Sequence, residues 1–236
     1  PVVASAYDRL VVTVPAGAQT APISVTTGDG TDTSSTLFYL PAELTRFTPT
    51  HGPAGTPVTL EGRNLLGVMQ VRFAGLPAAF LPPTQNTNLV AYVPENVPTG
   101  PITVTTPAGS ADTGSSWFYG QPAIEELSPT HGLPGTVVVL RGRNFLGATA
   151  VRFNGLQAAF QPPTNNTSLV ATVPNGAQTG PVEVVTPAGM ATSSVPFVLD
   201  YRSDLRLEGP SGPVVTQVGS NFSSTLFLRN LGPHVA

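Results

Sequence analysis

The sequence contains no cysteine and no lysine among its 236 residues. The absence of cysteine excludes disulfides, zinc sites with thiolate ligands and cysteine nucleophiles. The absence of lysine excludes Schiff-base chemistry and crosslinks that use a lysine amine in this segment. Packing and hydrogen bonds must therefore hold the fold together.

Charge is also scarce, at 10% of residues and a net charge of −3, where an ordinary soluble domain has about 25% charged residues. The ten cations are all arginines and form no concentrated patch, so we expect no nucleic-acid partner. The longest aliphatic run, residues 137–140, is far shorter than the roughly 20 residues that cross a bilayer, and no signal peptide opens the chain. We expect no membrane insertion in this segment.

Turn-forming residues are abundant, with 26 prolines and 24 glycines, and 40% of the residues are apolar. Short runs alternate apolar and polar residues between these turns, which is typical of antiparallel β-sandwiches. For example, Val58 and Leu60 are expected to face a core, as are Val71 and Phe73 on either side of an outward Arg72. Asn154-Gly155 predicts a two-residue hairpin turn.

A tandem repeat organises the chain, because Pro-Thr-His-Gly at 49–52 recurs at 129–132, a lag of 80 residues. At this lag, residues 44–119 align with 124–199 without a gap, which places Trp117 opposite Phe197 and so in a core or at a joint. Residues 10–39 match the second half of a repeat, and the register is lost after 199. We expect half a domain at 1–40, complete domains at 41–120 and 121–199, and the start of another domain at 200–236.

The repeated residues resemble the IPT/TIG family of immunoglobulin-like domains. The resemblance is carried by Pro49, Gly52, Gly55-Thr56, Val58, Leu60, Gly62, Asn64-Leu65, Val71, Phe73, Gly75, Val93-Pro94, Gly100-Pro101, Val104, Thr106-Pro107 and Gly109, and by their counterparts 80 residues later. It implies an all-β fold of tandem sandwiches strung as beads on a rod, and it implies no chemistry of its own. Residues 200–236, with Asn230-Leu231-Gly232-Pro233, resemble the start of an Asn-x-Gly-Pro repeat of prokaryotic surface proteins.

The candidate binding residues are four arginines at repeated positions, Arg63 with Arg72 and Arg143 with Arg152. If adjacent strands carry each pair, the guanidinium groups lie side by side and can bind a carboxylate or a glycan. A solvated sheet face is the alternative explanation for the same residues.

Neither a metal site nor a catalytic site is expected. His51 and His131 repeat but have no acidic or histidine neighbour in their turns, so a structural turn is the favoured interpretation. Residues 28–32 have the acidic, glycine-rich composition of a calcium loop but align with a plain hairpin turn. Glu125-Glu126 is the one adjacent carboxylate pair, and neighbours on a strand point to opposite faces. We therefore predict no enzyme activity and no cofactor.

Short proline-containing connections at 40–42 and 120–123 predict a semi-rigid rod. The sequence thus favours a non-catalytic extracellular or cell-surface protein with a structural or adhesive role, as stalk, fibre or filament. The alternative is an ancillary spacer or carbohydrate-binding region of a larger secreted carbohydrate-active enzyme or a lectin-like adhesin. The expected partners are neighbouring domains, other copies of the chain or surface glycans. Residues 200–236 of one copy would then complete residues 1–40 of the next by strand addition, unless the chain is an ordered fragment of a longer protein.

Overall fold

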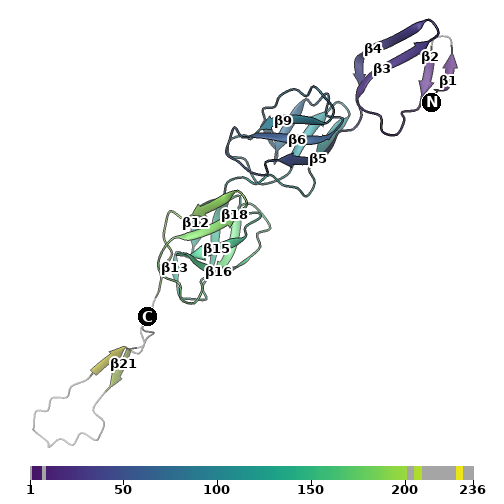
Figure 1. Ribbon diagram of the computed structural model, residues 1–236. Helices are drawn as coiled ribbons and strands as arrows, with labels where there is room; N and C mark the ends of the chain where they lie inside the picture. The colour runs from purple at the N-terminus through teal and green to yellow at the C-terminus, as the bar shows by residue number, and fades with distance from the viewer. Residues whose placement is uncertain (1, 7–8, 201–204, 209–226, 231–236) are drawn as a thin grey trace, which may run out of the picture.

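The structure, a computed structural model, describes residues 2–6, 9–200, 205–208 and 227–230 (Figure 1). It is all-β, as predicted, and none of the described residues forms a helix. Consequently none of them forms a helix long and apolar enough to span a bilayer. Three units lie in a row: a first unit of strands β1–β4, a second unit of β5–β11 and a third unit of β12–β20 (Figure 1).

The first unit consists of two separate antiparallel hairpins, β1 with β2 and β3 with β4. Its strands are β1 (Val2–Ala6), β2 (Arg9–Val12), β3 (Ala21–Thr27) and β4 (Gly30–Phe38). Of residues 28–32, the first two form the turn between β3 and β4, where Thr27 pairs with Gly30, and the other three begin β4. A hairpin was the favoured interpretation of this segment.

The second unit is a sandwich of two antiparallel sheets, ordered β5-β6-β9 and β11-β10-β7-β8. Its strands are β5 (Glu43–Thr48), β6 (Pro57–Arg63), β7 (Gln70–Phe73), β8 (Leu76–Ala78), β9 (Asn88–Tyr92), β10 (Ile102–Thr106) and β11 (Gly109–Asp112). The predicted inward residues fill the space between the sheets: Val58, Leu60, Val71 and Phe73 are all completely buried.

The third unit repeats this plan, with one long strand that joins the two sheets. Its strands are β12 (Ala123–Ser128), β13 (His131–Gly132), β14 (Val137–Arg143), β15 (Ala150–Phe153), β16 (Leu156–Gln161), β17 (Ser168–Thr172), β18 (Val182–Thr186), β19 (Gly189–Thr192) and β20 (Val198–Leu199). Because β16 pairs with both β15 and β17, the sheet order is β12-β14-β17-β16-β15-β18-β19. The turn between β15 and β16 has Asn154 at φ 46° and Gly155 at φ 82°, so the predicted hairpin is confirmed.

Each complete core contains an edge-to-face phenylalanine pair. The ring centroids of Phe73 and Phe118 are 5.1 Å apart, and those of Phe153 and Phe197 are 5.2 Å apart. Phe118 is therefore the counterpart of Phe197, and the gap-free alignment at lag 80 is wrong by one residue at its end. Trp117 is only half-buried, because Phe118 takes the core position that the alignment gave to Trp117.

The first unit has the same apolar strand faces, but they are uncovered. Leu10, Val12, Val14, Ile23, Val25 and Phe38 are between 43% and 49% exposed. Their counterparts in the second unit, from Leu89 to Phe118, are at most 3% exposed because they lie in the core between the two sheets of that unit. The predicted completion of this face by residues 200–236 of another copy stays a prediction, since most of that segment lies outside the described residues. The described residues of that segment form one strand pair, in which β21 (Leu205–Glu208) pairs with β22 (Phe227–Asn230).

Candidate functional site at the joints between units

The four candidate arginines are not on adjacent strands, so that part of the sequence prediction is wrong. Arg63 ends β6 in one sheet, whereas Arg72 lies on β7 in the other sheet. In the third unit, β17 and β16 separate the strands of Arg143 and Arg152. The physical reason is that the chain crosses from one sheet to the other between these strands. A glycan-binding role for the four residues stays a prediction.

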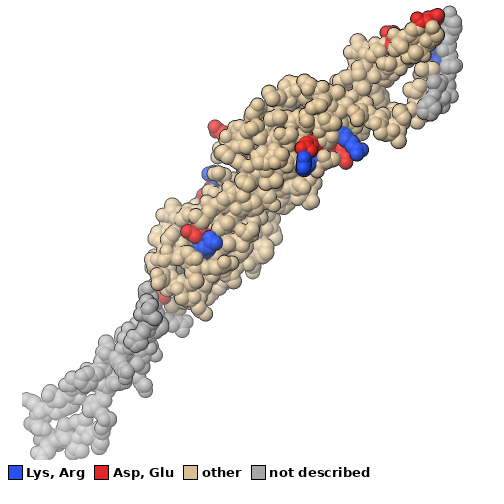
Figure 2. Space-filling view, in the orientation of Figure 1, with Lys and Arg blue, Asp and Glu red and all other residues tan. Residues whose placement is uncertain are grey.

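Arg72 is held by its own hairpin. Its Nε donates to Oε1 of Gln70 at 3.0 Å, and its NH1 donates to the carbonyl oxygen of Gly75 at 2.7 Å. Arg152 lies directly across the strand pair from Glu183. Charged side chains are sparse on the face seen in Figure 2, over the second and third units, so the arginines form no continuous basic surface there.

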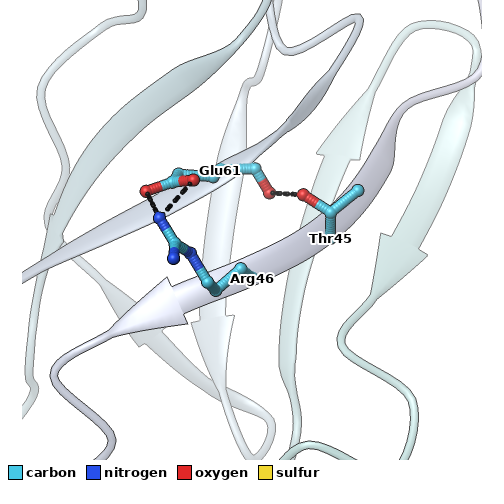
Figure 3. A network of polar contacts seen from close by, with 3 residues as sticks. All are labelled: Thr45, Arg46 and Glu61. Carbon is cyan, nitrogen blue, oxygen red and sulfur yellow. Dashed lines mark hydrogen bonds and ion pairs between the residues drawn. The ribbon is translucent and has the colours of Figure 1, made fainter.

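A cross-strand ion pair recurs with its charges exchanged. In the second unit NH2 of Arg46 contacts the two carboxylate oxygens of Glu61 at 2.8 and 2.9 Å, and the hydroxyl of Thr45 donates to the Glu61 carbonyl (Figure 3). In the third unit the same positions hold Glu126 and Arg141, 3.9 Å apart. The hydrogen bond to Glu61 and its negative charge raise the pKa of Arg46. Because both pairs are exposed, they add little stability to the β5–β6 and β12–β14 strand pairs.

The most specific polar arrangement is at the joints, where one asparagine reaches back into the preceding unit. At the first joint, Thr20 N donates to Oδ1 of Asn64 at 3.0 Å, and Nδ2 of Asn64 donates to the carbonyl of Pro41 at 2.9 Å. At the second joint, Thr99 N donates to Oδ1 of Asn144 at 2.8 Å.

Nδ2 of Asn144 then donates to the carbonyl oxygens of Val97 at 3.1 Å and Gln121 at 2.9 Å. We call this arrangement the asparagine clamp: Asn64 on Thr20 and Asn144 on Thr99. One carboxamide thus binds the preceding unit and the connection to its own unit together.

The sequence places this carboxamide through a sharp bend after β6 and β14. Asn64 and Asn144 have φ values of 56° and 60°, a left-handed conformation that asparagine adopts more easily than most residues. Asn144 is 4% exposed, so its amide has exchanged water for backbone partners. A buried amide left unpaired is costly, and the clamp satisfies it only when the two units are in register.

A second asparagine and the threonine hydroxyl complete each joint. Nδ2 of Asn86 donates to the carbonyl of Thr20, and Nδ2 of Asn166 donates to the carbonyl of Thr99, each at 2.8 Å. The Thr20 hydroxyl accepts from Leu40 N at 3.0 Å, and the Thr99 hydroxyl accepts from Gly120 N at 3.0 Å. Thr20 and Thr99 are accordingly 1% and 3% exposed, although Thr20 lies between exposed neighbours.

At each joint a tyrosine ring of the preceding unit also packs closely on a glycine of the following unit. The ring of Tyr39 lies so close to Gly67 that no side chain fits there, and the ring of Tyr119 covers Gly147 in the same way. Both glycines have positive φ, 85° and 79°. A side chain at Gly120 would collide with the carbonyl of Val97 and the Asn144 amide. The two joints therefore share polar contacts and steric fit.

The second joint also contains a polar cleft of ≈ 190 Å³. Residues of both units line it, among them Pro53, Asn96, Gln121, Arg143 and Asn144. Arg143 is exposed and lies in this cleft, apart from Arg152. Of the four predicted residues, it is the one that the structure brings together with other polar groups from two units.

The two histidines of the repeated turns pair through their backbones with the last residues of their units. His51 forms a parallel bridge with Tyr119, and His131 pairs with Val198. Nδ1 of His131 also contacts Oδ2 of Asp200 at 3.0 Å. Among the described residues no group of three or more His, Cys, Asp or Glu side chains is arranged to hold a metal ion.

Sequence reasoning did not identify the clamp, although its signal was present. Gly-Arg-Asn occurs at both 62–64 and 142–144. That repetition did not reveal a partner, because the partners are backbone groups of Thr20 and Thr99 in the preceding unit. Backbone groups are present at every position and leave no residue signature.

Several solved structures are similar to parts of this chain. SGBP-B from a xyloglucan utilization locus of Bacteroides uniformis is 18% identical, with a TM-score of 0.36 over 79% of this chain and 60% of that one. The surface glycan-binding protein PbSGBP-B from Prevotella bryantii is 14% identical, with a TM-score of 0.36 over 75% and 42%. The plexin A4 extracellular region is 20% identical, with a TM-score of 0.33 over 68% and 18%. The chain thus spans less than two thirds of each of these structures.

No match was found among curated proteins. The family model of the IPT/TIG domain matches residues 42–118 and 122–201. These segments contain the second and third units, with their paired sheets and phenylalanine cores. The chain therefore belongs to the IPT/TIG domain family, with two such domains in tandem.

Proposed function

We propose that this chain is a non-catalytic spacer: a rod of immunoglobulin-like units with locked joints, within a larger cell-surface or secreted protein. The observation that supports it most is the asparagine clamp, which occurs at both joints with equivalent atoms. At the second joint the Asn144 carboxamide is also buried and fully paired, which a flexible connection does not need. A spacer that holds another domain at a fixed distance and angle does need one.

The steric features of the joints support the same role. The connections between units are short, and Tyr39 and Tyr119 pack directly on Gly67 and Gly147 of the following unit. Relative motion would have to break the clamp and lift the ring together. The row of units in Figure 1 then represents one preferred arrangement.

Small-angle X-ray scattering of the chain tests this proposal. We expect an extended particle whose maximum dimension stays constant from low to high salt, because the clamp consists of neutral hydrogen bonds that salt does not screen. The double variant Asn64→Gly and Asn144→Gly is expected to give a shorter mean dimension and the scattering of a jointed chain. A compact or freely jointed wild-type particle would contradict the proposal.

Glycan binding is the second candidate, and the cleft at the second joint favours it. Asn96, Gln121 and Arg143 provide planar polar groups that suit sugar hydroxyls and carboxylates. Two of the similar structures are of surface glycan-binding proteins. In larger proteins of that kind, the rod would contribute both spacing and a contact surface.

A glycan array tests this second candidate. It compares the wild-type chain with the single variant Arg143→Ala and with a double variant that carries Arg72→Ala and Arg152→Ala. If the cleft binds a glycan, the signal falls at least about tenfold in Arg143→Ala, because a charge-assisted hydrogen bond is lost. The double variant should then keep its signal. Loss of signal in the double variant alone would move the site to the sheet faces, and no signal in the wild type would reject glycan binding by this segment.

A further inference from the structure

The polar cleft at the second joint has one charged residue in its lining, Arg143. The other described lining residues are neutral, and Glu95, which precedes the lining residue Asn96 in the sequence, does not line the cleft itself. Arg143 is exposed and takes part in no ion pair within the described part of the chain. Its guanidinium is therefore available to a ligand that carries a negative charge.

The equivalent arginine at the first joint, Arg63, has different surroundings. Arg63 lies directly across the β5–β6 strand pair from Glu43. Arg143 lies directly across the β12–β14 strand pair from Ala123. Because side chains that face each other across two strands are close enough to interact, Glu43 places a negative charge beside Arg63. The repeat thus keeps the cation at both joints but removes the facing carboxylate at the second.

A carboxamide stands in this cleft at a position where the other two units have glycine. Asn96 belongs to a turn that occurs in all three units, and its equivalents are Gly17 and Gly176. The φ values of Gly17, Asn96 and Gly176 are 78°, 53° and 83°. Glycine adopts this conformation at no steric cost, whereas an asparagine side chain adds a cost. The second unit accepts that cost in the turn that borders the cleft, as functional sites often do.

Gln121 adds a second carboxamide to the cleft. Its counterpart at the first joint is Pro41, whose ring has no hydrogen-bonding group. The backbone carbonyl of Gln121 accepts from Nδ2 of Asn144 at 2.9 Å, so the clamp fixes the base of this side chain. Differences from the first joint at positions 96, 121 and 123 therefore add two amides and leave a positive charge unmatched at one cleft.

We propose that this cleft binds a uronic-acid residue of an acidic polysaccharide. The Arg143 guanidinium binds the carboxylate, and the Asn96 and Gln121 amides bind ring hydroxyls, which both donate and accept hydrogen bonds. At ≈ 190 Å³ the cleft is smaller than the roughly 300–1,000 Å³ of pockets for drug-sized ligands, so it suits one sugar residue of a longer chain. This inference rests on glycan binding, the second candidate function, and names the ligand class.

Matched pairs of sugars test the inference in NMR titrations of the full chain. The probes are tetrasaccharides of galacturonic acid and of glucuronic acid, each as the free acid and as its methyl ester. The ester keeps the ring hydroxyls and removes the negative charge. We expect at least one free acid to bind about tenfold or more tightly than its ester, because only the acid makes a charge-assisted hydrogen bond to Arg143. The side-chain amide signals of Asn96 and Gln121 should shift on binding.

Arg143→Gln should lower the affinity for the free acid about tenfold or more, to that of the ester. The matched control Arg63→Gln, at the equivalent position of the first joint, should bind the acid as the wild type does. Equal binding of acid and ester by the wild type would overturn the inference but leave glycan binding in place.

Two further outcomes would also overturn the inference. Tetraglutamate carries carboxylates without ring hydroxyls, so it should bind more weakly than the free acids, and equally tight binding would reject a sugar as the ligand. Binding of none of the four saccharides would reject a uronic-acid site. The glycan array described above shows separately whether this segment binds any glycan, so the two failures are distinguishable.

Discussion

Replacing Asn144 by glycine is expected to expose the Thr99 amide and uncouple the second and third units. Glycine keeps the left-handed backbone, with φ of 60° at this position, so the variant removes the carboxamide without adding strain. Thr99 N, Val97 O and Gln121 O each lose their side-chain partner. Water can reach part of the opened joint, so we expect a net cost of about 2 kcal/mol.

Hydrogen exchange measures this cost directly, because about 2 kcal/mol corresponds to roughly 30-fold faster exchange of the Thr99 amide. Asn154→Gly is the matched control. Asn154 also has positive φ, at 46°, but lies in the turn between β15 and β16. Similar acceleration at Thr99 in both variants would show that backbone flexibility, and not the clamp, governs the joint.

Replacing Phe153 by alanine is expected to have the largest effect on stability. Phe153 is 1% exposed and packs edge-to-face on Phe197 in the centre of the third unit. Truncating such a side chain leaves a cavity and costs about 3–5 kcal/mol. For a unit of this size, that corresponds to a fall of more than about 10 °C in its melting temperature.

The two units provide each other's control for this prediction. In Phe153→Ala, exchange should accelerate across β14–β18, while the amides of β6–β10 keep their wild-type rates. Phe73→Ala, which removes the equivalent ring from the second unit, should give the opposite pattern. Loss of protection in both units from either variant would mean that they unfold as one cooperative body, with joints stronger than the clamp alone provides.

The cores could be predicted from the sequence because every second residue of a strand faces the core. Val58, Leu60, Val71 and Phe73 alternate with polar residues on strands, and all four are completely buried. The repeat then carried the same prediction to the third unit. The sequence pattern did not reveal that the third unit is one residue shorter before Phe197. A short turn absorbs this difference without altering the alternation in the strands.

Other features depend on how strands pair, which alternation alone does not specify. Arg63 and Arg72 lie on strands that follow each other along the chain, yet β6 pairs with β9 and β7 pairs with β10. The sequence could show that each arginine points outward, but not which sheet it is on. For the same reason, the charge exchange between Arg46–Glu61 and Glu126–Arg141 became interpretable only once the strands were paired.

The joints were predicted to be stiff from short, proline-containing connections, but the clamp gives a stronger physical reason. At the first joint the carbonyl of Pro41 accepts a hydrogen bond from Asn64. At the second joint the carbonyl of Gln121, which is not a proline, accepts the equivalent bond from Asn144. At the second joint we therefore expect stiffness to come from paired polar groups that the connection shares with both units. It depends less on restricted backbone angles than the sequence suggested.

Distances between spin labels on the second and third units test the central claim most directly. Because the chain contains no cysteine, Met69→Cys with Met190→Cys gives two labels at side chains that are 61% and 55% exposed. Electron–electron double resonance should show one narrow distance distribution in the wild-type background and a broad one when Asn144→Gly is added. Equally broad distributions in both backgrounds would contradict a joint locked by the asparagine clamp.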